Sequence, residues 1–445
     1  MDEIKLSDDV FEQIKDFNIW NLTKEQRLLI DKLITDKELK ECYKKNGLCK
    51  ECKQFNTCFC YCQPCKSQYF KQNFKNWTSG NHDVDEFIQK AQLKAEWYYK
   101  IIEWIEYDKF EDVEYLAKGG FGTTFKAVWK DGPWTINNFQ FERKGETKVA
   151  LKCLHNSQDI TADFLKEVES NILVYYTSNV VRCFGIAKDP KTNNFIMVME
   201  LKNGSLRQHL NNNFISLDWN QKLCSLYCIA IGLNDIHKKG LIHQDFHCGN
   251  ILSDFNKNAF ITNLGLCQPA NVKSSQNNNK KIYGVLPYVA PEVLREKEYT
   301  QKSDIYGFGI IAYETCTGFP PYHDIAHDDF LAMKICNGLR PKSNYKLPQF
   351  IFDIINQCWD ADPLKRPNAD ELQKLFGDLY IKSYSNSYSV IKEQIKEADE
   401  INKKSSSSPT AQSPLSSTII DDLFEIEYSE SIKVTKLNIN SKDCN

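Results

Sequence analysis

The stretch from Leu241 to Leu252, which reads LIHQDFHCGNIL, constrains the fold of this chain more than any other feature. It places the polar residues His243, Asp245 and Asn250 between two apolar pairs. Further landmarks follow it in order, namely Ala290-Pro291-Glu292, the run DIYGFG at 304–309, and Cys358-Trp359-Asp360 with Pro363 and Arg366-Pro367 after it. A chain that holds all of these in one order is restricted to very few folds.

With H-x-D-x-x-x-x-N at 243–250 and A-P-E at 290–292, residues 109–378 resemble the catalytic domain of eukaryotic protein kinases. Within that family the domain resembles the tyrosine-kinase-like group, and the DIYGFG run and the closing C-W…P…R-P pattern agree with the resemblance. The resemblance implies an α+β, two-lobed fold, in which a β-rich lobe closes over ATP and a helical lobe carries the catalytic loop. It also implies an ATP-dependent protein kinase of intracellular signalling, with Ser/Thr favoured over Tyr, whose partner is a protein substrate or another kinase.

A glycine-rich turn near the start of this region runs from Ala117 to Gly122 between two strand-like segments. Such a turn lets backbone N–H groups approach phosphates closely, although many glycine-rich hairpins are only turns. Lys152 ends the next strand-like segment, and Glu167 lies in a helical segment after it. Glu167 is the favoured partner of Lys152, and Glu169 is the alternative.

The resemblance also implies roles for individual residues. Lys152 would hold the α- and β-phosphates and pair with Glu167, Asp245 would accept the proton of the substrate hydroxyl, and Asn250 would hold Mg²⁺. A buried ion pair is expected between Glu292 and Arg366. The expected contacts with ATP and its metal are Ala117, Gly119, Gly120, Phe121, Gly122, Thr124, Ala150, Lys152, Met199, Glu200, Leu252 and Asn263.

The chain departs from the kinase pattern at the metal-binding motif. Where active kinases have D-F-G, this sequence has Asn263-Leu264-Gly265, 18 residues after Asp245. An amide offers Mg²⁺ a dipole where a carboxylate offers a full charge. A loss of about 4 kcal/mol of metal stabilisation would slow the chemistry roughly 10³-fold. The sequence therefore predicts either a kinase of reduced activity or an inactive pseudokinase that acts as a scaffold or allosteric partner. Gln244, in place of the usual arginine, points the same way.

The cysteines form the other distinctive pattern, because seven of the 17 lie between Cys42 and Cys65. Cys49-x₂-Cys52 and Cys62-x₂-Cys65 present two pairs of thiolates, as structural zinc sites do. Cys58 and Cys60 leave the choice open, since Cys58 could replace Cys62. The alternatives are a loop of reduced thiols or a redox sensor. Zinc is favoured, because so small a segment can hardly bury a core without metal or contact with the kinase domain.

Composition and charge outside these motifs limit the other regions of the chain, its partners and its location. Residues 1–108 are expected to form a helical and Cys-rich region, and the Ser-rich residues 379–445 a mostly disordered tail. Lys+Arg 56 against Asp+Glu 59 provides no basic field for nucleic acid, and no apolar run is long enough for a membrane span. With no signal peptide at its start, the chain is expected in the cytoplasm, with the nucleus as the alternative.

Overall fold

The computed structural model describes residues 6–119, 122–137, 140–154, 162–175, 179–254, 258–269, 282, 284–384 and 389–406. It divides into two compact units. The strand-rich unit comprises residues 1–117, 123–165 and 183–201, and the helical unit comprises 118–122, 166–182 and 202–445. Gly120 and Phe121, two of the predicted ATP contacts, lie outside the described residues.

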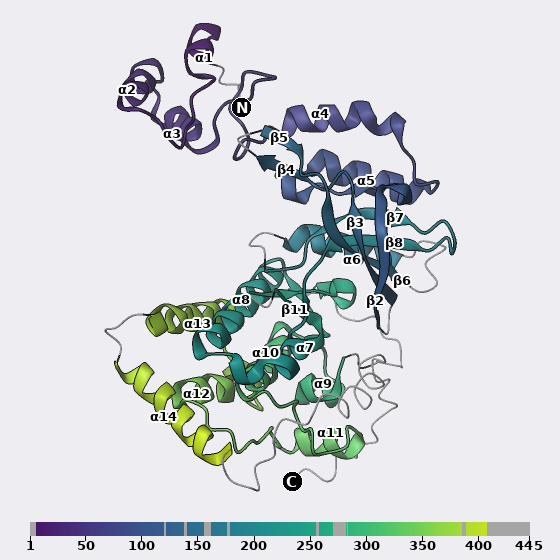
Figure 1. The fold of residues 1–445 in the computed structure, drawn as a ribbon, viewed down its shortest axis with the longest axis vertical. Coiled ribbons are helices and arrows are strands. Elements are labelled where there is room, and N and C mark those ends of the chain that lie inside the picture. The colour runs from purple at the N-terminus through teal and green to yellow at the C-terminus, as the bar shows by residue number, and fades with distance from the viewer. Residues whose placement is uncertain are drawn as a thin grey trace. The chain divides into compact units, whose positions relative to one another are not determined.

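A six-stranded sheet forms the centre of the strand-rich unit (Figure 1). Its strands, in spatial order, are β1 (Glu103–Trp104), β7 (Cys183–Lys188), β8 (Phe195–Glu200), β6 (Thr147–Leu154), β3 (Gly122–Trp129) and β2 (Phe110–Gly119). The edge strand β1 runs parallel to β7, with Glu103 opposite Gly185. A Cβ on Gly185 would lie 2.1 Å from the carbonyl oxygen of Glu103, so only glycine admits β1 at this position. The sheet therefore recruits a strand from before residue 109.

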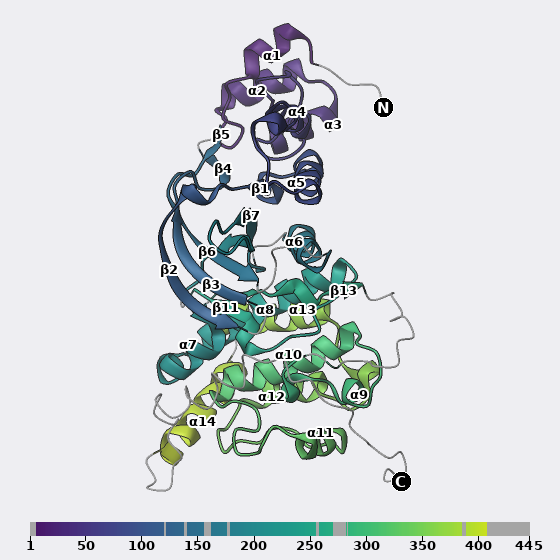
Figure 2. The ribbon, with the colours of Figure 1, turned by 90° about the vertical axis from the view of Figure 1, so that its right-hand side faces the viewer.

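The first hundred residues build two small helical clusters in the same unit. Helices α1 (Asp8–Ile14), α2 (Lys24–Leu33) and α3 (Lys37–Asn46) bury Ile14, Ile30, Ile34 and Tyr43 together. Helices α4 (Gln63–Asn73) and α5 (His82–Lys94) lie against each other (Figure 2). The hairpin of β4 (Trp134–Asn137) and β5 (Gln140–Arg143) packs with α4 through Phe70 and Trp134. Side-chain caps fix the starts of α2 and α3. The side chains of Thr23 and Asp36 accept hydrogen bonds from the backbone N–H groups of Gln26 and Leu39, respectively.

Helices dominate the other unit (Figure 1). They are α7 (Leu206–Asn213), α8 (Trp219–Lys238), α9 (Pro291–Leu294), α10 (Gln301–Thr317), α11 (Asp329–Cys336), α12 (Gln349–Cys358) and α13 (Ala369–Tyr384), while α6 (Ala162–Val174) runs from the strand-rich unit into this one. The loop at 243–250 lies between two short strands, β10 (Leu241–Ile242) and β11 (Ile251–Ser253). Three further short strands pair with them, namely β9 (Gly204–Ser205), β12 (Ala259–Ile261) and β13 (Gln268–Pro269). One strand-rich unit and one helical unit confirm the predicted α+β class.

A further helix, α14 (Ser389–Ser406), follows α13 and packs on the helical unit. Its Ala398 is buried, Asp399 accepts from the indole N–H of Trp219 at 2.9 Å, and Asn402 exchanges hydrogen bonds with the backbone of Lys346. Residues 389–406 thus form an ordered helix within the segment 379–445 that the sequence predicts to be mostly disordered. The segment holds few large apolar residues, and polar contacts from a distant part of the chain complete its packing.

Candidate functional site

One carboxylate of helix α10 anchors the catalytic loop. Asp304, which is 2 % exposed, accepts hydrogen bonds from the backbone N–H groups of His243 at 2.8 Å and Gln244 at 3.1 Å. Its Oδ2 also lies 2.8 Å from Nε2 of His237. Gln244 needs this support because its φ of 68° is in the left-handed region, which non-glycine residues rarely adopt. The landmark at 304–309 therefore acts by holding the backbone that leads into Asp245.

Three predicted site residues meet in the helical unit. The amide nitrogen of Asn250 donates to the carboxylate Oδ2 of Asp245 and to its backbone oxygen, both at 2.8 Å. The amide nitrogen of Asn263 lies 3.4 Å from Oδ2 of Asp245 and 3.3 Å from the side-chain oxygen of Asn250. Asn263 also has a left-handed φ of 64°, a conformation that asparagine adopts more readily than most residues. The amide nitrogens of both asparagines thus face one oxygen, Oδ2, of the Asp245 carboxylate.

This donor set suits Mg²⁺ poorly. Magnesium takes oxygen ligands in strict octahedral geometry and prefers carboxylates. Here the Asn250 oxygen already accepts the Asn263 amide, and Asn263 presents its nitrogen to the cluster. The Asn263 amide would have to turn its oxygen inward before it could help to hold the ion.

His247 is a site residue that the sequence reasoning missed. Its Nε2 lies 3.4 Å from Oδ1 of Asp245, and its Nδ1 accepts the backbone N–H of Gly249 at 3.1 Å. Burial alone would raise the pKa of Asp245, but His247, with His243 and Asn250, outweighs burial and holds that pKa below its usual value. The available signal was a second histidine two residues after Asp245.

The predicted phosphate-holding residues occupy regular elements. Lys152 lies on β6 opposite Met197, two positions after Ala150, which pairs with Met199 of β8. Glu167 lies on α6 and is 4 % exposed, close enough to Gly265 that a Cβ there would be 2.7 Å from its Oε2. The pairing of Lys152 with Glu167 stays a prediction.

The other predicted ATP contacts are placed as follows: Ala117 is exposed on β2, Gly119 ends β2, Gly122 begins β3, Thr124 is half-buried on β3, Glu200 ends β8, and Leu252 lies on β11 between its partners Ser205 and Phe260. Their roles toward ATP stay predictions.

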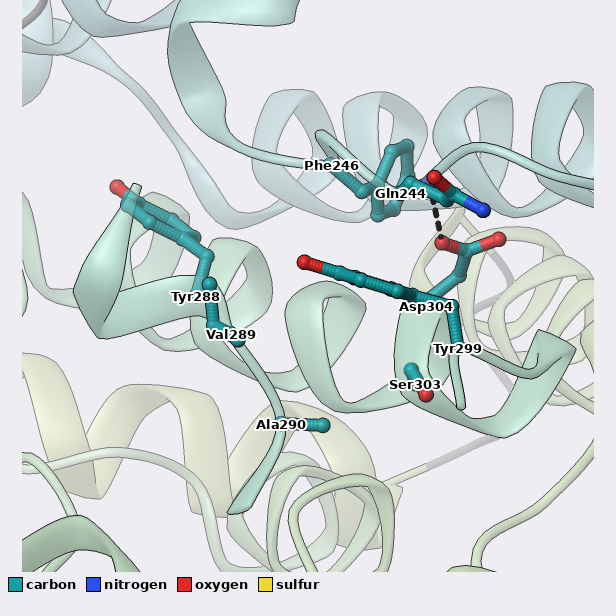
Figure 3. Close-up of a pocket in the computed structure, with 8 residues that line it drawn as sticks. All are labelled: Gln244, Phe246, Tyr288, Val289, Ala290, Tyr299, Ser303 and Asp304. Atoms are coloured by element: carbon teal, nitrogen blue, oxygen red, sulfur yellow. Dashed lines mark hydrogen bonds between the residues drawn. The ribbon is translucent and has the colours of Figure 1, made fainter. Parts of the chain in front are cut away.

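A small pocket adjoins the catalytic loop (Figure 3). It is lined by Gln244, Phe246, Tyr288, Val289, Ala290, Tyr299, Ser303 and Asp304. Asp304 carries the only formal charge among these eight residues. With Gln244 in place of the usual arginine, the pocket lining provides no cation for a phosphate on the activation loop.

The predicted ion pair between Glu292 and Arg366 is present. The guanidinium makes two parallel hydrogen bonds to the carboxylate, at 2.7 and 2.8 Å. The Arg366 side chain is 0 % exposed and that of Glu292 is 8 % exposed, so each needs the other for its buried charge. The pair joins the A-P-E segment to the loop before α13.

The structure also brings together the four cysteines favoured by their spacing. The sulfurs of Cys49, Cys52, Cys62 and Cys65 all lie within 4.8 Å of one another, with Cys49–Cys65 at 3.7 Å and Cys52–Cys62 at 3.6 Å. A tetrahedral zinc with Zn–S bonds of 2.3 Å requires sulfurs about 3.8 Å apart. The chain supplies the first pair in a turn, where Lys53 N–H bonds to the Cys49 carbonyl, and the second pair at the start of α4.

The geometry also separates these four from their neighbours. Cys58 points away and lies 3.2 Å from the backbone oxygen of Glu96, and burial raises its pKa to about 12. Within the group of four, the contact between the Cys49 and Cys62 thiols lowers the pKa of Cys49 and raises that of Cys62, so the two thiols share a proton in the absence of metal. The group that could hold a metal therefore excludes Cys58 and Cys60.

Comparison with known proteins agrees with the resemblance to protein kinases. The family model described as protein tyrosine and serine/threonine kinase matches residues 110–376. A "Probable serine/threonine-protein kinase" of Dictyostelium discoideum is 28% identical over 285 residues, which cover 63% of this chain and 29% of that protein. Another of the same description and organism is 32% identical over 278 residues, covering 59% of this chain and 9% of the relative. A "Dual specificity protein kinase" of that organism is 29% identical over 283 residues, covering 62% and 37%.

The chain thus spans well under half the length of these relatives, and the similarity concerns one region of each. Among the described helices, none is both long and apolar enough to cross a bilayer.

Proposed function

Because this chain belongs to the protein tyrosine and serine/threonine kinase family, we propose that it binds ATP and transfers the γ-phosphoryl group to protein serine or threonine at a reduced rate. The names of the relatives, serine/threonine-protein kinase and dual specificity protein kinase, support this substrate class. We also propose that the chain belongs to the tyrosine-kinase-like group, which the motifs at 243–250, 290–292, 304–309 and 358–367 resemble together.

The retained hydrogen-bonded carboxylate Asp245 is the observation that carries the proposal. In the transfer, the substrate hydroxyl oxygen forms a bond to the γ-phosphorus as the bond to the bridging oxygen of ADP breaks, and the hydroxyl proton passes to Asp245. The amide of Asn250, at 2.8 Å, and His247, at 3.4 Å, hold both carboxylate oxygens in place. Lys152 would hold the α- and β-phosphates, with Glu167 as its partner.

The kinase domain implies Mg²⁺ as well as ATP, and bound Mg²⁺ would neutralise phosphate charge. Asn250 and Asn263 are its nearest candidate ligands, but their amides fit the ion poorly. This misfit is why we propose a reduced rate.

Transfer of labelled γ-phosphate to a mixture of Ser/Thr and Tyr peptides, with Mg²⁺ or Mn²⁺, tests the proposal. The wild type should label Ser/Thr peptides, and Asp245→Asn should reduce labelling by about 10²-fold or more, the usual worth of a general base. Equal labelling by both proteins would rule out catalysis by this site.

A pseudokinase is the second candidate, and the contact of the Asn263 amide with Asp245 favours it. In that case the amide substitutes for a metal and closes the cluster, and the protein works as a scaffold or allosteric partner of another kinase. Thermal stabilisation by ATP separates the outcomes. A site that binds ATP at 100 times its Kd gains about 2.7 kcal/mol, whereas a site that does not bind ATP shows no shift.

We propose, in addition, that Cys49, Cys52, Cys62 and Cys65 hold a structural zinc ion. The spacing of their sulfurs and the burial of Cys49 and Cys62 support a closed, four-thiolate site. Metal analysis of the purified protein should find one zinc per chain, and Co²⁺ substitution should give the absorption of tetrahedral cobalt thiolate. Unchanged zinc content after Cys52→Ser and Cys62→Ser together would refute the site.

A further inference from the structure

The four-cysteine site lies between two separate apolar clusters. Leu48 and Phe55, which flank the first cysteine pair, pack against the core of helices α1–α3. Tyr61 and Phe70, which flank the second pair, belong to the cluster that contains the β4–β5 hairpin. A metal bound to both pairs would therefore cross-link the two clusters.

The β4–β5 hairpin is the point where the second cluster meets the kinase sheet. The hairpin connects β3 to β6, and its Trp134 and Phe141 stack at 4.5 Å with planes 6° apart. The ring centroids of Tyr69 and Phe70, both on α4, lie 6.0 and 6.3 Å from that of Trp134, in edge-to-face arrangement. The ring of Tyr61 meets that of Phe141 in the same way, with their centroids 5.8 Å apart. Such edge contacts depend on ring placement, so the helix that begins at the second cysteine pair positions the hairpin.

From the hairpin, polar contacts continue into the sheet. Arg143 donates to Glu103 of the edge strand β1 at 2.7 Å, and the indole of Trp134 donates to the same carboxylate at 3.2 Å. The Arg143 guanidinium also lies over two rings, 4.2 Å from that of Trp134 and 5.7 Å from that of Trp129. Trp129 is 1 % exposed in the sheet core, at the end of β3. Contacts therefore run without a break from the cysteine site to β1 and β3.

We propose that the four-cysteine site is a metal-dependent brace of the kinase sheet. With zinc bound, α4 holds the β4–β5 hairpin, and the hairpin holds β1 and the strands β3 and β6, which carry the predicted ATP contacts Thr124 and Lys152. The inference rests on the zinc site proposed above and adds that zinc occupancy controls the order of the sheet.

The physical reason is the size of the two clusters. The α1–α3 core has four buried residues and the α4 cluster has five, too few to remain folded without a cross-link. Because binding free energy at a structural zinc site is folding free energy, metal loss releases α4 and the ring edges that position Trp134.

Hydrogen–deuterium exchange of the full chain, with zinc and after its removal by a chelator, tests the brace. We expect amides of residues 134–137 and 140–143 to exchange at least about tenfold faster after zinc removal, while amides of α8 and α10 stay unchanged. Added zinc should restore protection. This readout requires neither ATP binding nor catalysis.

Two tryptophan variants provide the matched control. Trp134→Ala should keep one zinc per chain, but its hairpin exchange should no longer respond to the metal. Trp20→Ala removes a ring that contacts Phe59 on the cysteine module, and its hairpin should respond as in the wild type. Should Trp134→Ala fail to fold, Tyr69→Ala, which removes one ring edge from Trp134, should give an intermediate response.

The outcomes separate the two ideas. Zinc bound by the wild type, with unchanged hairpin exchange after its removal, overturns the brace and leaves the zinc site standing. Wild-type protein that binds no zinc overturns both. An equal metal response in Trp134→Ala and Trp20→Ala also overturns the brace, because the coupling would then bypass the hairpin.

Discussion

Replacing Asn263 by aspartate would restore the carboxylate that this site lacks, and would test the assigned contact between Asn263 and Asp245. The amide nitrogen of Asn263 now lies 3.4 Å from Oδ2 of Asp245. In Asn263→Asp, a carboxylate oxygen takes its place and faces the Asp245 carboxylate. The substitution therefore exchanges a hydrogen bond for a like-charge contact.

The size of the effect follows from the distance. Two unit charges 3.4 Å apart repel by about 5 kcal/mol at an effective dielectric constant of 20. Asn263 is half-buried, so water screens part of this, and we expect a loss of about 2 kcal/mol in the free energy of unfolding without metal. Mg²⁺ between the carboxylates should reverse the sign of the contact, so Mg²⁺-ATP should stabilise the variant more than the wild type.

Urea unfolding, followed with and without Mg²⁺-ATP, measures both quantities, and the transfer assay should show a faster rate in the variant. Asn258→Asp is a matched control, because exposed Asn258 donates to Asp254 at 2.8 Å and its replacement also creates an acid pair. That pair faces water and should cost little. If Asn263→Asp unfolds like the wild type without metal and gains nothing from Mg²⁺-ATP, the assigned geometry around Asp245 is wrong.

Three more predictions concern the helical unit. Arg366→Met strands the buried Glu292 carboxylate and should cost about 3–5 kcal/mol in urea unfolding, with part of the loss recovered when Glu292→Gln is added. Burial lowers the pKa of Lys222 to about 8, from 10.5 in an unfolded chain. Between pH 8 and 10.5 the unfolded chain therefore binds one proton more than the folded chain. The free energy of unfolding of the wild type, relative to that of Lys222→Met, should rise across this range by about 1.4 kcal/mol per pH unit. A difference that does not change with pH would contradict this. Ala398→Arg cannot fit its buried position and should release α14, which limited proteolysis would detect as new cleavage between α13 and α14.

Local spacing predicted the parts of the site that lie on one short segment. Asp245 and Asn250 are five residues apart, and their hydrogen bond is a property of one loop. The contact of His247 with Asp245 depends on how the backbone turns at Gly249, which spacing does not show. The choice of Cys62 over Cys58 likewise depends on which thiol faces the first pair and which faces Glu96.

The sequence by itself determined the kinase family, the missing charge at Asn263, and the two cysteine pairs, because these depend on residue identity and order. Only the tertiary structure decided that β1 joins the sheet beside Gly185, that Trp134 and Phe141 pack with α4, and that α14 folds onto α8. Each of these contacts joins residues far apart in the chain. These contacts are stabilised by packing and desolvation that arise only when distant surfaces meet, so no local sequence pattern predicts them.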